Sequence, residues 1–454
     1  MKFFIYLVTT ILVVLTSNTI YAQYDSLQIY KNYRNIVEKI FNAAHRDSSA
    51  WQQLAYMCDT YGPRLCGSEG LEKSLNYMFE QMKNDGLQNV RKDEVMVPKW
   101  VRGDEYCGMI SPRKTKLHFL SLGGSVSTPK DGITSEVIVV KSFDELDRRK
   151  NEIKGKIVLY NEPYINYGQA VAYRWAGAVN AAKYGAVASL CRSVSPIGMQ
   201  SPHTGSIMPY PDTLTKIPHG ALSHEDADMI ERIVSRGEKV ILKIYMEAQT
   251  LPDVMSFNVI GELKGTEKPQ EIITIGGHSD SWDVGSGAQD DASACFATWK
   301  ALKILNDLGL KPKRTIRVVL WVNEENGLRG GKDYAERYKN ENHILLFEFD
   351  SGIFPIGEFG INGSDSVFSK AKSIEKVLRD FGNIRIKKGA WGIDAQQLAE
   401  LKKIPLMNFN TDDEEKYFWF HHSATDTPDK INPKDMNDCI AAIAAMMYIY
   451  SDLP

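Results

Sequence analysis

The chain has 454 residues, of which 43% are hydrophobic, 10% aromatic and 24% charged. This ordinary composition excludes a disordered polyampholyte, a collagen-like repeat and a coiled coil, and the length suggests roughly three structural units. The formal net charge is −3. A chain so close to neutral lacks the positive surface of nucleic-acid-binding and polybasic membrane-binding proteins, so we expect neither kind of partner.

The N-terminal segment, residues 1–22, is predicted to be a signal peptide. Lys2 gives a positive start, Phe3–Leu15 is mostly apolar, and a more polar stretch ends in a cleavage point at Ala22. An N-terminal membrane anchor is the alternative, but the apolar run is short for a bilayer. No later stretch approaches the length of a membrane span, so we expect no stable membrane insertion. The prediction is a secreted protein, which includes extracellular, lysosomal and periplasmic destinations.

The six cysteines are too few for a disulfide scaffold. Secretion permits disulfides, and Cys58 and Cys66 are close enough in a turn-rich segment that they could pair. The sequence does not decide that pairing. Cys295 lies in an apolar helical run, which favours a buried free thiol.

The first part of the chain after the signal segment contains a predicted helix over residues 70–85. Leu71, Leu75, Met78 and Met82 fall on one face of it, and Gly86 follows its end. From about residue 117 to residue 260, short apolar runs are separated by Gly and Pro, which predicts a strand-rich module. Its elements are expected to be strands at Glu136–Lys141, Lys156–Tyr160, Ala186–Leu190 and Val240–Met246, with a helix at Val171–Tyr184.

From Glu271 onwards, strand and helix patterns alternate. The predicted strands are Glu271–Gly276, Thr315–Val322, Ile344–Phe349 and Pro405–Phe409. The predicted helices are Ala292–Leu308, Gly331–Tyr338 and Asp435–Tyr450. Strands separated by helices of this length indicate βαβ units. We therefore expect an α/β fold with a mixed, largely parallel sheet flanked by helices.

Residues that can bind a metal follow three of these strands at their carboxyl ends. They are His278 and Asp280 after the first strand, Glu324 and Glu325 after the second, and Asp350 after the third. Ligands of open α/β sheets bind at this edge, so we expect these side chains to converge. Two further pairs complete the pattern: Asp290-Asp291 begins the next helix, and His421-His422 lies near the C-terminus.

Each of these residues alone has an ordinary structural explanation, such as a helix cap or a solvated pair. Together they offer two imidazole positions and three carboxylate positions. The residue pattern leaves the choice within each adjacent pair open. Such a set exceeds the needs of one open catalytic zinc and suits two metals that share a carboxylate. The glutamate of the Glu324-Glu325 pair that is not a ligand is then available as a general base for water.

The motifs that surround these residues resemble the co-catalytic dinuclear zinc aminopeptidase family. They are Gly276–Ser293, Val322–Gly327, Glu348–Gly352 and Tyr417–Ser423. Shorter motifs at Tyr61–Ser68, Tyr164–Tyr167 and Ser201–Gly205 resemble a secreted dipeptidase branch of that family. The resemblance extends over essentially the whole chain after the signal segment.

The resemblance implies a role for each candidate residue. His278 and Asp350 would bind one zinc, Glu325 and His422 a second, and Asp290 would bridge the two. Glu324 would be the general base, and the Asp280 carboxylate would orient His278. Asp291 and His421 would not be ligands.

The resemblance also implies the organisation and activity of the chain. A zinc exopeptidase domain would be formed by residues 23–125 and 251–454, with a protease-associated module inserted at residues 126–250. The chain would bind two Zn²⁺, act on unblocked dipeptides and form a homodimer.

Three other functions can be compared with this one. A broader aminopeptidase would share the metal centre and differ only in its substrates. A non-catalytic, receptor-like ectodomain is disfavoured because no expected ligand is missing. A serine hydrolase is disfavoured because the chain has no Gly-x-Ser-x-Gly motif.

Overall fold

The computed structural model describes residues 24–454, and the predicted signal peptide at residues 1–22 lies outside them. Within the described residues, the strands form two eight-stranded sheets, here called sheet I and sheet II. None of the helices in this part of the chain is long and apolar enough to cross a bilayer.

Sheet I is mixed and has its parallel strands at the centre. Its order is β1 (Gln88–Val101), β10 (Gln249–Leu263), β12 (Arg314–Trp321), β11 (Lys268–His278), β13 (Asn342–Glu348), β16 (Leu406–Thr411), β14 (Ile356–Ile361) and β15 (Arg385–Lys388). The neighbours β12, β11, β13 and β16 run parallel, whereas β10 and β14 pair antiparallel with this central group. The predicted α/β fold with a mixed, largely parallel sheet is confirmed.

Both faces of sheet I are covered by helices, because its central strands carry apolar side chains on both sides. On β12, Ile316 and Val318 belong to one hydrophobic core, and Val319 and Trp321 belong to the other. The larger core also contains residues of α1 (Ser26–Arg46), α2 (Ser49–Tyr61), α3 (Glu69–Asn84), α7 (Ser293–Asp307), α9 (Asp365–Leu378) and α12 (Pro433–Asp452). The smaller core contains residues of α8 (Arg329–Tyr338) and α10 (Ile393–Lys402).

Sheet II is formed by the chain between β1 and β10, residues 102–248, here called the inserted segment. Its order is β3 (Thr115–Lys116), β2 (Glu105–Ser111), β9 (Ile241–Met246), β5 (Ile133–Val140), β6 (Ile157–Tyr160), β7 (Ala188–Arg192), β8 (His219–Leu222) and β4 (Phe119–Ser121). Helices α4 (Phe143–Arg148), α5 (Tyr167–Ala182) and α6 (His224–Ser235) accompany it. Ala178 of α5 and Ile230 of α6 belong to two different cores.

Sheet II begins earlier in the chain than the predicted inserted module, which starts at residue 126. The strands β2, β3 and β4 precede that residue, yet β2 pairs with β9 and β4 pairs with β8. Backbone pairing with these distant strands places β2 and β4 in sheet II. Neither Glu105–Ser111 nor Phe119–Ser121 has an apolar run that predicts it.

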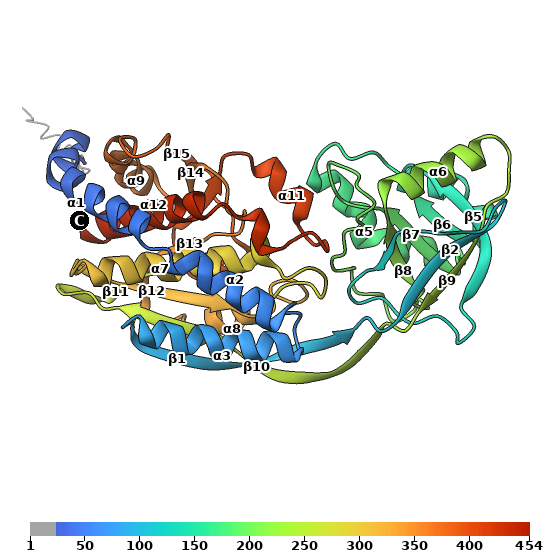
Figure 1. The fold of residues 1–454 in the computed structure, drawn as a ribbon, viewed down its shortest axis with the longest axis horizontal. Helices are drawn as coiled ribbons and strands as arrows, with labels where there is room; N and C mark the ends of the chain where they lie inside the picture. Colours follow the sequence, from blue (N-terminus) through green and yellow to red (C-terminus); the bar gives the residue numbers. More distant parts are fainter. Residues whose placement is uncertain (1–23) are drawn as a thin grey trace, which may run out of the picture.

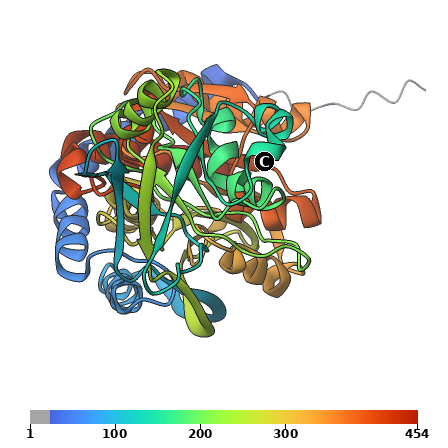
Figure 2. The ribbon, with the colours of Figure 1, turned by 90° about the vertical axis from the view of Figure 1, so that its right-hand side faces the viewer.

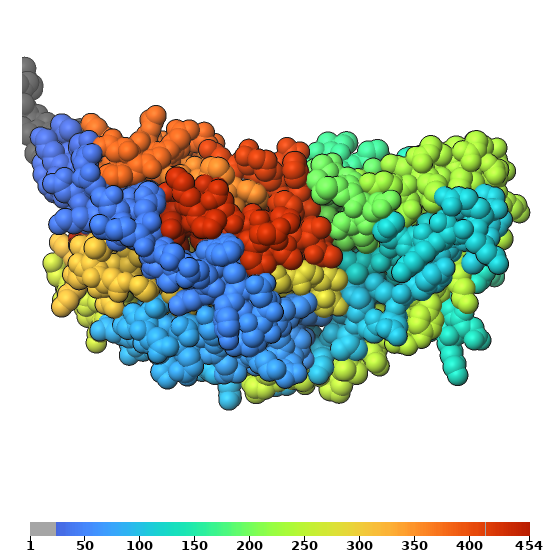
Figure 3. Space-filling model, in the orientation of Figure 1, coloured from blue at the N-terminus to red at the C-terminus, as the bar shows by residue number. Residues whose placement is uncertain are grey.

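The two sheets lie side by side and give an elongated molecule (Figure 1). Strands β1 and β10 pair antiparallel along their length and lead from sheet I to sheet II. Figure 2 views the molecule from the side of sheet II, with sheet I behind it. In the space-filling view of Figure 3, the red C-terminal segment adjoins the green part of the inserted segment. The backbone N–H of Thr204 donates to the carbonyl of His422 across this contact, over 2.9 Å.

All six cysteines are buried and unpaired. The possible Cys58–Cys66 disulfide therefore does not form. The Sγ atom of Cys58 lies 3.6 Å from the carbonyl oxygen of Ser286, and that of Cys66 lies 3.5 Å from Asp280 Oδ2. Cys295 is a buried free thiol, as its apolar context predicts.

Candidate metal centre

Parallel strands of sheet I bring the predicted metal-binding residues to one edge. His278 ends β11, Glu324 and Glu325 follow β12, and Asp350 follows β13. The other two, Asp290 and His422, come from loops that reach the same edge: Asp290 lies in a short helical turn before α7, and His422 follows α11 (Tyr417–Phe420). The structure thus brings all six predicted residues together, and none of them lies elsewhere.

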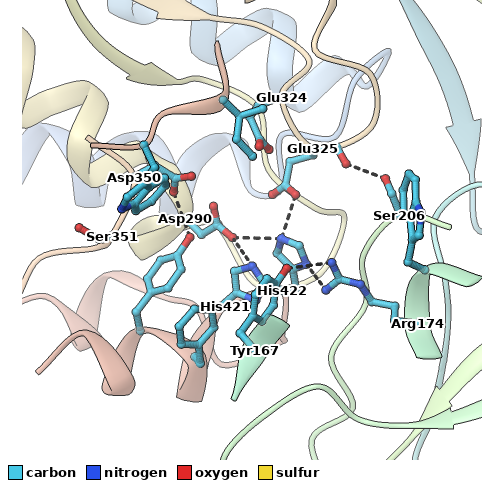
Figure 4. Close-up of a pocket in the computed structure, with 15 residues that line it drawn as sticks. Tyr167, Arg174, Ser206, Asp290, Glu324, Glu325, Asp350, Ser351, His421 and His422 are labelled. Carbon is cyan, nitrogen blue, oxygen red and sulfur yellow. Dashed lines mark hydrogen bonds and ion pairs between the residues drawn. The ribbon is translucent and has the colours of Figure 1, made fainter. Parts of the chain in front are cut away.

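Asp290 lies between Asp350 on one side and Glu325 with His422 on the other (Figure 4). Its Oδ1 atom is 3.1 Å from His278 Nε2, which in turn lies 3.7 Å from Asp350 Oδ1. Its Oδ2 atom is 3.3 Å from His422 Nε2, which lies 2.9 Å from Glu325 Oε2. Each carboxylate oxygen of Asp290 therefore faces a different histidine, and each of these histidines approaches a different acid. This is the arrangement expected of a carboxylate shared by two ions.

The adjacent histidines differ in their contacts. His422 Nε2 approaches two acids, whereas His421 Nε2 is 3.8 Å from Asp290 Oδ2 and approaches only that one. The His421 ring stacks on the His422 ring with a centroid separation of 3.5 Å. The other His422 nitrogen, Nδ1, lies 3.2 Å from the carbonyl oxygen of Thr204. A proton on Nδ1 would donate to that carbonyl and leave Nε2 free as a ligand atom.

The adjacent aspartates also differ. Asp290 faces the histidines, whereas Asp291 Oδ2 accepts a hydrogen bond of 3.0 Å from the backbone N–H of His278. Asp291 thereby supports the end of β11. The backbone N–H of Asp290 donates to Asp426 Oδ2 over 3.1 Å, and that carboxylate also accepts from the N–H of Gln289.

Asp280 contacts both His278 and the Glu324-Glu325 pair. Its carboxylate accepts hydrogen bonds from the backbone N–H groups of Glu324 and Glu325, over 3.0 and 3.3 Å. The carboxylate oxygen nearest to His278 Nδ1 is 3.8 Å away, whereas the Asp280 carbonyl oxygen is 3.1 Å away. Asp280 therefore contacts His278 through its backbone and uses its side chain to position the Glu324-Glu325 pair.

The chemistry of these groups fits bound cations. Burial, and next the nearby carboxylates of Asp290 and Glu324, raise the pKa of Glu325 well above its usual range. Burial, followed by the charges of His421 and Arg174, lowers the pKa of His422 well below its usual range. A neutral imidazole is the form that binds metals. Asp290 Oδ2 and Glu325 Oε1 are buried without a hydrogen-bond donor among the described residues, and a cation would satisfy both.

Glu324 completes the site as a carboxylate beside the ligand groups. Burial raises the pKa of Glu324 to about 8, with His278 opposing this shift and Asp350 adding to it. Positive charge bound nearby would lower that pKa and favour the proton-accepting form of Glu324.

A pocket of about 440 Å³ opens over the centre and has walls from both parts of the chain. Asp290, Glu324 and Asp350 lie on the side of sheet I, whereas Tyr167, Arg174, Trp175 and Ser206 belong to the inserted segment. Trp391, Ile393 and Phe418 add apolar surface. The volume is within the usual range for small-ligand sites.

Several supporting residues were not predicted from the sequence. The buried guanidinium of Arg64 donates to the carbonyl oxygens of Ser279, Ser286 and Gly287 over 2.5–2.8 Å and holds the loop after β11. The Tyr417 hydroxyl donates to Asp350 Oδ1 over 3.1 Å. The Ser206 hydroxyl donates to the Glu325 carbonyl over 2.6 Å. All of these residues except Ser206 belong to the motifs quoted above, but the motifs alone do not indicate their contacts.

Comparison with known proteins places this chain in a family. Residues 258–447 match the model of peptidase family M28. The chain is 42% identical to mouse carboxypeptidase Q over 427 residues, which cover 93% of this chain and 90% of the relative. It is 41% identical to human carboxypeptidase Q, with 92% and 89% covered.

Solved structures agree with this placement. The crystal structure of a peptidase M28 precursor from Shewanella amazonensis superposes with a TM-score of 0.88 at 31% identity, covering 93% of this chain and 98% of the other. This chain therefore belongs to peptidase family M28, is homologous to the carboxypeptidase Q proteins, and is a zinc metallopeptidase.

Proposed function

We propose that this protein is a dinuclear zinc exopeptidase that hydrolyses unblocked dipeptides. The observation that carries the proposal is the position of Asp290, whose two carboxylate oxygens face two separate groups of ligands. One zinc would be held by His278 and Asp350, the other by Glu325 and His422, with Asp290 shared. The pocket above them, of about 440 Å³, suits a small substrate.

The residues around the pocket support a hydrolytic cycle. Bound zinc would supply Lewis acidity toward the substrate carbonyl and lower the pKa of the attacking water. Glu324 accepts the proton of that water as it attacks the carbonyl carbon. Glu324 then returns the proton to the leaving amine when the peptide bond breaks. Asp280 holds Glu324 in place through the backbone N–H.

A library of free dipeptides, assayed with and without a chelator, tests this proposal. We expect hydrolysis of free dipeptides, loss of activity on chelation and recovery with zinc. Metal analysis of the purified protein should give two zinc ions per chain. N-acetylated dipeptides should be poor substrates. Absence of zinc together with absence of turnover would favour the non-catalytic, receptor-like alternative.

A broader aminopeptidase is the second candidate, since it would share the metal centre. Longer peptides with free N-termini distinguish the two. An aminopeptidase cleaves them as fast as dipeptides, whereas a dipeptidase does not. A blocked dipeptide cleaved as fast as the free one would argue against both.

We further propose that the protein is secreted and dimeric. The pattern of residues 1–22 supports export, and the family resemblance supports a homodimer. Mass spectrometry of the exported protein should find a new N-terminus near residue 23, and light scattering should find twice the chain mass. An intact N-terminus in the membrane fraction would instead indicate an anchor.

A further inference from the structure

Arg174 is a buried cation in the wall of the candidate active site. It lies in α5 of the inserted segment, and its exposed fraction is 6%. Its guanidinium points toward His422 (Figure 4). The Nη1 atom lies 3.2 Å from His422 Nδ1. Arg174 thus brings a positive charge from the inserted segment to the metal-binding edge of sheet I.

The hydrogen bonds of Arg174 leave its charge without an anionic partner. Nη1 donates to the carbonyl oxygen of Thr204 over 3.2 Å, and Nη2 donates to the hydroxyl of Tyr167 over 2.9 Å. Nε is buried and has no acceptor among the described residues. Arginine has five N–H donors, so these uncharged partners do not exhaust it. A buried charge without a counter-charge is costly, and a bound anion would offset that cost.

The other acids of the pocket do not supply this anion. The three carboxylates proposed as zinc ligands, together with Glu324, carry as many negative charges as two Zn²⁺ ions carry positive charges. Among the residues that line the pocket, Arg174 is then a cation without a carboxylate partner. An anionic group of the substrate would supply one.

Arg174 lines the same pocket as the candidate zinc ligands, on the wall that the inserted segment supplies. Its Nη1 atom contacts the Nδ1 side of the His422 ring, whereas Nε2 is the candidate ligand atom of that ring. A substrate held at the metals therefore meets this guanidinium if it carries an anion close to its scissile bond. In a dipeptide, the C-terminal carboxylate is such a group.

We propose that Arg174 binds the free C-terminal carboxylate of the substrate and so determines the preference for dipeptides. This inference rests on the proposed dipeptidase function and names the residue that would select the substrate. The planar guanidinium suits a carboxylate because it can donate two parallel hydrogen bonds to it. Thr204 and Tyr167 hold the guanidinium in place.

The experiment compares Phe-Leu with its C-terminal amide, Phe-Leu-NH₂, in the zinc-loaded enzyme. The wild type should prefer the free acid. Arg174→Gln should raise KM for Phe-Leu by about 10- to 100-fold and leave KM for the amide within about twofold. Arg174→Lys should recover part of the loss. The zinc content should be unchanged in both variants. Arg236→Gln, at an exposed arginine of the inserted segment, serves as the control.

A binding measurement separates this proposal from the proposed function. Calorimetry should show that L-leucine binds to the zinc-loaded wild type and much more weakly to Arg174→Gln, with leucinamide weak for both. Equal losses for Phe-Leu and its amide, or unchanged leucine binding in Arg174→Gln, would overturn the role of Arg174. If the wild type cleaves no dipeptide, the proposed function fails, and leucine binding still decides whether Arg174 is a carboxylate site.

Discussion

Glu324 and its neighbour Glu325 have the same side chain but face different parts of the site. Glu325 faces His422, whereas Glu324 lines the pocket and belongs to none of the metal-binding groups found among residues 24–454. The backbone N–H groups of both residues are held by the same Asp280 carboxylate. Glu325 is thereby directed to the candidate metal ligands and Glu324 to the pocket.

The substitution Glu324→Gln should remove the proton acceptor while keeping the shape of the side chain. We expect kcat to fall by about 10²- to 10⁴-fold, the usual contribution of a general base, with the zinc content unchanged. Steady-state kinetics on a dipeptide and metal analysis check the two parts. Glu336→Gln, at an exposed glutamate of α8, should behave as wild type. Near-normal kcat in Glu324→Gln would refute the role as base, and lost zinc would make Glu324 a ligand.

Some residue roles could be predicted from the sequence, and others could not. Polar residues directly after apolar strands are visible in sequence, so His278, Glu325 and Asp350 could be expected at one edge. Arg64 could not be assigned, because its partners are carbonyl oxygens of a loop more than 200 residues away. The two hydrogen bonds that the Asp280 carboxylate accepts were not predicted for the same reason, because the donors are backbone N–H groups 44 and 45 residues further on.

At the scale of elements, the prediction was most accurate where the apolar pattern is strong. The central strands of sheet I and helix α7 are found within a few residues of their predicted ranges. The edge strand β15, Arg385–Lys388, has only one buried residue and was not predicted. The antiparallel pairing of β14 with β16 was also not predicted. Pairing direction and edge strands depend on backbone hydrogen bonds between distant segments, which leave little trace in local composition.

Helix α9 contains a buried lysine, Lys370, that the apolar pattern of the helix does not predict. Lys370 lies on its buried face with an exposed fraction of 7%. Its Nζ donates to the carbonyl oxygen of Leu453 over 3.1 Å and lies 4.1 Å from the centre of the Tyr450 ring. Burial lowers the pKa of Lys370 to about 7, with Arg314 adding to the shift and Glu271 opposing it. In the unfolded chain, the same amine keeps its proton up to about pH 10.4.

The substitution Lys370→Met should therefore change how stability depends on pH. Between pH 7 and pH 10 the unfolded wild type holds more protons than the folded one, so the free energy of unfolding rises with pH. Relative to Lys370→Met, the wild type should gain roughly 3–4 kcal/mol across this range. Urea unfolding at several pH values measures the free energy of unfolding of both proteins. Lys376→Met, at an exposed lysine of α9, should follow the wild type. Parallel curves for the wild type and Lys370→Met would contradict the shifted pKa.

At the scale of the whole molecule, the pocket exists only because the inserted segment lies against sheet I. Arg102, just after β1, joins the two. It donates to both carboxylate oxygens of Asp283 in the loop after β11, with Nε to Oδ2 at 2.8 Å. It also donates to the Ser121 hydroxyl over 2.9 Å and lies 3.4 Å from the Thr204 hydroxyl. A single side chain thus ties the junction strand, sheet II and the loop beside His278.

The substitution Arg102→Met should loosen this junction, because it removes the cation and leaves Asp283 without its partner. We expect a loss of roughly 2–3 kcal/mol in the free energy of unfolding. We also expect a higher KM, since Thr204 and Arg174 lie on the displaced side of the pocket. Asp283→Asn should have a smaller effect, because an amide still offers one acceptor to Arg102. The double variant should be little worse than Arg102→Met alone, since both changes remove the same contact. Additive losses in urea unfolding would show that the two residues act independently and that the inserted segment is held by other contacts.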